Sequence, residues 1–197
     1  MPKPSLKEAI LEAGLKAMFR TGYNGTSVRD VTAAAGAPQG SFTNHFRSKE
    51  AFASEVLERY FAHTRGLVAD ALDDGSLTPR ARLSRYLDII TGRLEADGFS
   101  RGCLIGDFSL EASGSSEILR TRLAEIFAEW RTPFAACIAE AQKAREISSE
   151  FEPQELAEFL LASWQGAILR MKVERNAAPL ERFKEIAFQT VFKELSS

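Results

Sequence analysis

Short hydrogen-bonding side chains gather in one stretch near the amino terminus of this 197-residue chain. Gln39 and Asn44 carry amides that can make paired hydrogen bonds to the edge of an adenine base. Ser41 and Thr43 can bond to a base edge or to a phosphate, and Lys49 follows them with a positive charge. This set of side chains indicates contact with a nucleic acid, through hydrogen bonds in a groove and through charge on the backbone.

Cys103 is the second place where the residues could do chemistry. It follows Arg101 and Gly102 near the expected start of a helix, where the helix dipole and a guanidinium would favour the reactive thiolate. The alternative is that Cys103 is a small buried residue packed in a helix, which is common for cysteine. Cys137 lies between apolar residues of a long helical pattern, so we expect it in the core.

The sequence holds no pattern for catalysis or for a resident metal ion. A glycine-rich phosphate loop, an HExxH motif and paired-cysteine metal spacing are all missing. His45 and His63 are the only histidines, and neither has an obvious partner for acid–base or metal chemistry. We therefore expect no enzyme, no cofactor and no metal. A helical adaptor that binds other proteins through wide apolar faces is the alternative to a nucleic-acid-binding protein.

A helix-turn-helix pattern would position the polar stretch. Its first helix would have Thr26 or Ser27 as the cap, an acidic residue in the first turn and one apolar face. Gly36 supplies the left-handed residue that ends this helix, and Pro38 suits the first turn of the next one. The second helix would expose its polar side chains around one buried anchor, Phe42, which suits insertion into a major groove.

The run from Thr26 to Glu50 resembles the DNA-binding signature of TetR-type transcriptional repressors. The landmarks that it shares with this signature are Gly36, Gly40, Ser41, Phe42, Phe46, Ser48, Lys49 and Glu50. The family often carries Tyr where this chain has Thr43 and an aromatic residue where it has His45, so a tyrosine contact to the DNA backbone is not carried over. His45 would either donate to a phosphate or cover the core of the motif.

The resemblance implies an all-α regulator that binds double-stranded operator DNA. We expect its DNA contacts to come from Thr26, Gln39, Gly40, Ser41, Thr43, Asn44, His45 and Lys49. Thr26 and Lys49 would bind phosphates, together with the first backbone amides of a third helix capped by Ser48. Gln39 and Asn44 would be the side chains best able to read bases.

Composition and charge agree with one small basic module and a larger helical domain. The first 50 residues carry seven Lys and Arg against four Asp and Glu, or +3, and the remainder carries 18 against 23, or −5. With 45% hydrophobic residues, the chain can bury a substantial core. No apolar run is long enough to span a bilayer, the first residues lack a signal-peptide core, and two distant cysteines fit a reducing compartment. We expect a cytoplasmic protein without a membrane partner.

Helical periodicity divides the chain into two domains. We expect the helix-turn-helix domain over residues 1–50, with a first helix that begins after Ser5 and is stopped by Gly22. A connector helix would run over 48–72, and an effector-binding and dimerisation domain over 73–197. The later helices are predicted at about 83–96, 102–112, 117–145, 153–176 and 179–195, with a kink at Pro133.

The last two helices have wide apolar faces, which would either complete the monomer core or form a four-helix bundle with a second copy. The resemblance favours a homodimer, with Phe159, Trp164, Ile168, Phe183, Phe188 and Val191 at the interface. A two-fold dimer would place two reading helices about one DNA turn apart, roughly 34 to 36 Å, and would select a near-palindromic operator.

The stretch GCLIGDFSLEAS, which begins at Gly102, resembles the NemR-like subgroup of the family, which controls reductases acting on quinones and maleimides. The resemblance implies that Cys103 takes part in sensing an electrophile. We expect a small-molecule effector to meet Cys103, Phe108, Trp130, Phe134 and Trp164, with Asp107, Glu111, Gln165 and Arg170 as polar specifiers. Aromatic residues at helical spacing can equally be core.

Overall fold

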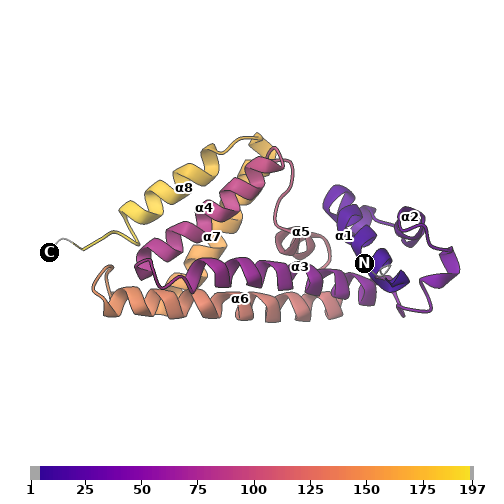
Figure 1. Ribbon diagram of the computed structural model, residues 1–197, viewed down its shortest axis with the longest axis horizontal. Coiled ribbons are helices and arrows are strands. Elements are labelled where there is room, and N and C mark those ends of the chain that lie inside the picture. Colours follow the sequence, from indigo (N-terminus) through magenta and orange to yellow (C-terminus); the bar gives the residue numbers. More distant parts are fainter. Residues whose placement is uncertain (1–4, 196–197) are drawn as a thin grey trace. The chain divides into compact units, whose positions relative to one another are not determined.

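The computed structural model describes residues 5–195, and every regular element within them is helical (Figure 1). The elements are α1 (Leu6–Gly25), α2 (Val28–Ala34), the single 3-10 turn η1 (Gln39–Ser41), α3 (Lys49–Leu72), α4 (Pro79–Ala96), α5 (Leu104–Glu111), α6 (Glu117–Lys143), α7 (Pro153–Glu174) and α8 (Ala178–Gln189). The expected all-α fold is confirmed. No helix among these residues is both long enough and apolar enough to cross a bilayer.

The chain forms two compact units, and each is built from two separate stretches of sequence. The first unit contains residues 5–63 and 104–126, and the second contains 64–103 and 127–195. The first unit therefore includes the helix-turn-helix segment together with α5 and the beginning of α6. The compact unit around the helix-turn-helix is thus larger than the stretch 1–50.

The amino-terminal helix begins where the sequence predicts, and its regular part ends at the predicted glycine. The Ser5 hydroxyl accepts a hydrogen bond from the amide of Glu8 at 3.3 Å, which satisfies one of the unpaired donors of the first turn. Gly22 has φ 73° and ψ 178°, a conformation that only glycine adopts without strain. The regular helix is therefore broken at Gly22, although α1 continues as one further turn to Gly25.

The helix-turn-helix is held by one cap, one glycine and a cluster of three aromatic rings. Ser27 is the cap of α2, and its hydroxyl accepts from the amide of Asp30 at 3.1 Å. Gly36 has the expected positive φ of 62°. Phe42, Phe46 and Phe52 are buried, with ring centroids between 4.9 and 5.2 Å apart. This three-phenylalanine cluster attaches the segment after the turn to α3.

The second helix of the motif is shorter than predicted. Gln39–Ser41 is one turn of 3-10 helix, and residues 42–45 continue it as hydrogen-bonded turns rather than as an α-helix. The amide of Phe42 donates to the carbonyl of Gln39 at 3.4 Å, and the amide of His45 donates to the carbonyl of Phe42 at 3.0 Å. Phe42 anchors this segment, because its ring is 3% exposed and packs against the rings of Phe46 and Phe52.

The second unit is a bundle in which α4, α7 and α8 pack together (magenta to yellow in Figure 1). Tyr86 of α4 lies edge-on to Phe134 of α6 at 4.8 Å, and both rings are almost completely buried. Trp164 of α7 packs against Phe183 of α8 at 5.4 Å. Helix α6 runs without interruption through Pro133, and the predicted kink there stays a prediction.

Helix α8 ends at Gln189, so its predicted extension to Leu195 was wrong. Beyond Gln189 the chain is no longer helical and packs against other residues of the second unit. Phe192 is fully buried, and the amide of Leu195 donates to the carbonyl of Glu146 at 3.1 Å. The apolar residues after Gln189 have the spacing of a continuing helical face, but they form a short non-helical tail.

Candidate DNA-binding site

The segment from Gln39 to His45 presents a continuous polar surface. Gln39, Gly40, Thr43, Asn44 and His45 are all exposed. The three-phenylalanine cluster lies behind them, so the segment is fixed on its inner side and open on its outer side. Exposed amides on a rigid support are what base reading in a groove requires.

Two of the expected DNA contacts, Ser41 and Thr26, lie on the inner side instead. The Ser41 hydroxyl donates to the carbonyl of Pro38 at 2.5 Å, and the Thr26 hydroxyl donates to the carbonyl of Gly22 at 2.7 Å. Thr26 is only 2% exposed. In the free protein these hydroxyls hold backbone turns in place, and the structure does not bring them onto the polar surface.

Lys49 lies at the start of α3, beside the end of α1. Its ammonium is 4.5 Å from the centre of the Tyr23 ring and 3.5 Å from the carbonyl oxygen of Asn24. Burial lowers the pKa of Lys49, while the nearby Glu111 carboxylate acts in the opposite direction. Lys49 is therefore a positioned cation rather than a freely moving one.

The first turn of α3 has the expected cap. The Ser48 hydroxyl accepts from the amide of Ala51 at 3.1 Å, and the Ser48 carbonyl accepts from the amide of Phe52 at 3.1 Å. The first amides of a helix have no acceptor within that helix. The amides of Lys49 and Glu50 are thus suited to bind a phosphate together with the Lys49 ammonium.

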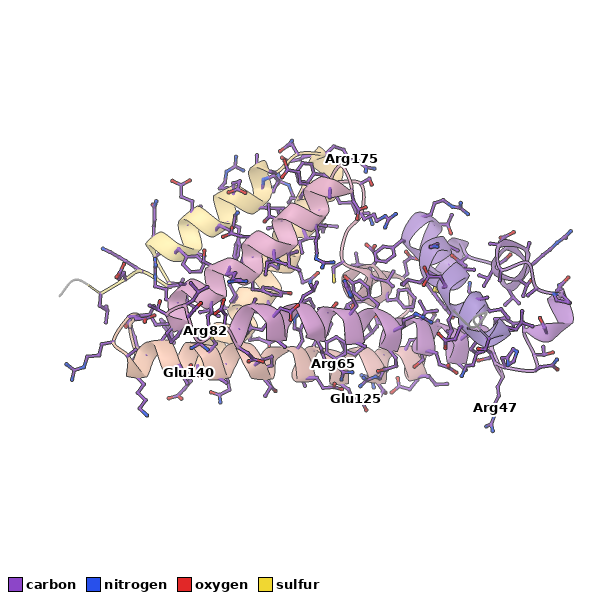
Figure 2. All side chains as sticks on the ribbon, viewed as in Figure 1. Arg47, Arg65, Arg82, Glu125, Glu140 and Arg175 are labelled. Atoms are coloured by element: carbon purple, nitrogen blue, oxygen red, sulfur yellow. The ribbon has the colours of Figure 1, made fainter. Side chains whose placement is uncertain are left out.

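Sequence reasoning missed two cations, Arg29 on α2 and Arg47 after the three-residue turn. Both are exposed, and neither forms an ion pair within residues 5–195. Figure 2 shows the Arg47 side chain projecting away from the ribbon. The first 50 residues carry a net positive charge, but a count of charges does not show which cations are paired with carboxylates. Arg29 and Arg47 join the candidate phosphate contacts.

Cys103 lies just before α5 and is buried, with 7% of its surface exposed. Arg101 is turned towards Asp97, whose carboxylate lies 3.8 Å from its guanidinium. The thiol lies near the hydroxyl of Tyr86, where burial raises the pKa of Tyr86 far above its usual range and the Cys103 sulfur adds to the rise. The indole N–H of Trp130 lies close to the Tyr86 hydroxyl and lowers the pKa of Tyr86, although the two groups do not have the geometry of a normal hydrogen bond.

The aromatic residues expected around an effector are divided between the two units. Phe108 belongs to the first unit, where its ring lies 5.5 Å from that of Tyr23. Trp130, Phe134 and Trp164 belong to the second unit, and all three are almost completely buried. The indole N–H of Trp164 has no hydrogen-bond acceptor among the described residues.

The structure places Glu111 differently from its expected role as a polar specifier of the effector. Its side chain accepts a hydrogen bond from the backbone amide of Asn24 at 2.9 Å, at the end of α1. The two residues are 87 positions apart in the sequence. Glu111 therefore contacts the helix-turn-helix segment of the first unit.

The residues expected at a dimer interface lie along α7, α8 and the tail. Phe159, Phe183 and Val191 line an apolar groove of about 350 Å³. Trp164 and Ile168 do not line this groove; they are buried, at 1% and 5% exposed. The ring of Phe188 lies 5.2 Å from the Arg80 guanidinium.

Comparison with known proteins agrees with this geometry. Residues 10–56 match the model of the bacterial regulatory proteins of the tetR family, and residues 79–187 match that of the tetracyclin repressor-like C-terminal domain. The chain is 43% identical to the HTH-type transcriptional repressor DhaR of Mycobacterium sp. strain GP1, over 97% of this chain and 94% of that one. It is 28% identical to the HTH-type transcriptional repressor NemR of Escherichia coli, over 89% and 88% of the two chains.

Solved structures give the same result. A regulatory protein TetR from Rhodobacter sphaeroides superposes with a TM-score of 0.87 at 34% identity, over 92% of this chain and 97% of that one. The reduced form of E. coli NemR superposes with a TM-score of 0.87 at 26% identity, over 98% and 100%. The resemblance found in the sequence is thereby confirmed, and it excludes an enzyme. The chain belongs to the TetR family and is a DNA-binding transcriptional repressor of the helix-turn-helix type.

Proposed function

We propose that the protein binds a near-palindromic operator as a homodimer, in the cytoplasm, and that a small-molecule or electrophilic effector releases it. The observation that carries this proposal is the polar surface from Gln39 to His45, fixed on the three-phenylalanine cluster and flanked by the cations Arg29, Arg47 and Lys49. Gln39 and Asn44 read bases on this surface. The three cations and the first amides of α3 bind phosphates and set the register.

The apolar groove along α7 and α8 supports the homodimer. Phe159 and Ile186 are 48% and 56% exposed, and both line the groove. Exposed large apolar residues concentrated on one face are costly in water and are covered when two copies pair by a two-fold axis. A two-fold dimer presents two copies of the polar surface, which explains why the operator should be nearly palindromic.

Cys103 and its neighbours support an effector that reacts with or binds near a thiol. The Tyr86 hydroxyl lies near the Cys103 sulfur, and the Trp130 indole N–H lies near the Tyr86 hydroxyl; both groups are hydrogen-bond donors. A thiol can add to the C=C bond of a quinone or maleimide: a C–S bond forms, and the thiol proton ends on the ring carbon next to the carbonyl. The two donors could bind the carbonyl oxygen as negative charge develops on it. The relative NemR is named a repressor, and one of its structures is described as a reduced form.

The dimer is tested with two isoleucines of equal exposure. Ile186 and Ile118 are both 56% exposed, but only Ile186 lines the groove. We expect Ile186→Glu to shift sedimentation towards the monomer and to weaken binding to a palindromic duplex selected from a random pool by the wild-type protein. Ile118→Glu should leave both unchanged. A dimer that withstands Ile186→Glu would contradict the proposed interface, and no preference of the wild type for any duplex would contradict the proposed operator.

A further inference from the structure

The carboxylate of Glu111 closes the turn that leads from α1 into the helix-turn-helix. Its Oε2 accepts from the backbone amide of Asn24 at 2.9 Å. The side-chain amide of Asn24 donates in return to the backbone carbonyl of Glu111 at 3.3 Å. Glu111 is the last residue of α5, so these two bonds join α5 to the turn at the end of α1. A hydrogen bond to a charged group is about twice as strong as one between neutral groups.

Gly22 is shaped to receive this carboxylate. A Cβ atom on Gly22 would lie 2.2 Å from Oε1 of Glu111 and 2.6 Å from Oε2. The positive φ of Gly22 independently disfavours any residue with a side chain. The backbone of Gly22 and the Glu111 carboxylate therefore fit together as one contact, which does not tolerate displacement of either part.

The same turn carries two groups of the DNA-binding site. The carbonyl of Gly22 accepts from the Thr26 hydroxyl at 2.7 Å, and Ser27, the cap of α2, is the next residue. The carbonyl of Asn24 lies 3.5 Å from the Lys49 ammonium. A shift of the turn would therefore move both the start of α2 and the cation at the start of α3.

We propose that Glu111 is a positioning residue for DNA binding, which holds the turn from Gly22 to Asn24 and thereby fixes α2 and Lys49 in the arrangement that the operator requires. The proposal rests on the proposed operator binding, and the same assay measures the binding of the wild-type protein as a separate test of that function. It assigns to α5, a helix outside the helix-turn-helix, a part in the affinity for DNA. The residue does so without touching DNA itself.

Two conservative variants separate the reach of the side chain from its charge. Glu111→Gln keeps the length of the side chain, and its amide oxygen can still accept from Asn24. Glu111→Asp keeps the charge but shortens the side chain by one methylene, so that the carboxylate no longer reaches the amide. If Glu111 acts by holding the turn, Gln should preserve function better than Asp.

The test uses the full-length protein and a duplex selected from a random pool by the wild-type protein. We expect Glu111→Ala to weaken binding about tenfold or more, and to reduce the slope of log K against log salt by about one because the Lys49 contact is lost. Glu111→Gln should stay within about threefold of wild type, with Asp weaker than Gln. Glu117→Ala is the control, because Glu117 pairs on the surface of α6 with Arg120 three residues later.

A double-mutant cycle completes the test. Gly22→Ala and Glu111→Ala break the same contact. The double mutant should therefore lose clearly less binding free energy than the sum of the losses of the two single mutants. Far-UV circular dichroism checks that each variant is folded at the assay temperature. If Glu111→Ala does not fold, the comparison of Glu111→Gln with Glu111→Asp tests the proposal. The proposal is overturned if folded Glu111→Ala binds like wild type, or if Asp binds as well as or better than Gln.

Discussion

The guanidinium of Arg80, at the start of α4, donates from Nε to the carbonyl oxygen of Phe192 at 2.7 Å. It also donates from Nη2 to the carbonyl of Phe188 at 3.2 Å. The last carbonyls of a helix have no donor within it. Arg80 therefore supplies donors to the end of α8 and to the tail that follows.

We expect Arg80→Ala to lower the free energy of unfolding by about 1–3 kcal/mol, because two partly buried carbonyls lose charged donors. The measurement is urea unfolding, from which both the midpoint and the m-value, the slope of the unfolding free energy against urea concentration, are determined. Arg85→Ala, on the same helix, removes an exposed ion pair with Asp74 and should cost less. Equal losses for the two variants would show that the bonds from Arg80 contribute nothing particular.

Two glycines on neighbouring helices should respond in opposite directions to alanine. A Cβ atom on Gly14 would lie 2.2 Å from Cζ of Phe52, so Gly14→Ala should push on the three-phenylalanine cluster and cost about 1–3 kcal/mol. Gly66 on α3 is exposed, with nothing within 4 Å, so Gly66→Ala should stabilise by roughly 0.5–1 kcal/mol. Thermal unfolding followed by circular dichroism measures both. A stabilising Gly14→Ala would mean that Phe52 moves away freely.

Gln39 and Lys49 should affect DNA binding in different ways. Gln39→Ala should relax sequence choice by about 1–3 kcal/mol at one base pair, because a base contact is lost. Lys49→Ala should weaken cognate and random DNA alike and flatten the salt dependence, because a phosphate contact is lost. Titrations of both duplexes at several salt concentrations distinguish the two effects. If both variants changed cognate and random binding equally, the assignment would fail.

Cys103→Ser should retain operator binding and lose release by a quinone or by N-ethylmaleimide. Cys137 provides the control thiol: its Sγ donates to the carbonyl of Pro79 at 3.2 Å, and burial raises its pKa to about 11. At neutral pH this thiol is almost fully protonated, and thiols react through the thiolate. Cys137→Ser should therefore release like wild type. Release that persists in Cys103→Ser would remove the electrophile mechanism and leave a non-covalent effector.

Local signals in the sequence predicted most of the fold. Ser5 and Ser48 cap helices as expected, Gly36 has the expected positive φ, and Gly22 interrupts the first helix as expected. These features depend on residues within four positions of one another, so they can be read from the sequence directly. The polar surface from Gln39 to His45 was predicted for the same reason, because a short segment around a buried Phe42 leaves its other side chains outside.

The features that the sequence did not predict depend on residues far apart in the chain. Arg80 donates a hydrogen bond to the carbonyl of Phe192, 112 positions away, in the tail that follows α8. Glu111 contacts Asn24 at the end of α1, 87 positions away, although the sequence led us to expect it beside an effector. Ser41 and Thr26 could not be placed either, since a hydroxyl next to an open backbone carbonyl can turn inward as easily as outward.

The composition of the first unit has a consequence for synthesis on the ribosome. This unit combines residues 5–63 with 104–126, and Glu111 and Phe108 from the later stretch contact the turn and Tyr23 of the earlier one. A nascent chain of which only the helix-turn-helix has left the ribosome therefore still lacks residues 104–126 of the compact unit. The complete unit can form only after residues 64–103, which belong to the other unit, and then the second stretch 104–126 have been translated. We therefore expect newly made repressor to become competent for DNA binding late in translation.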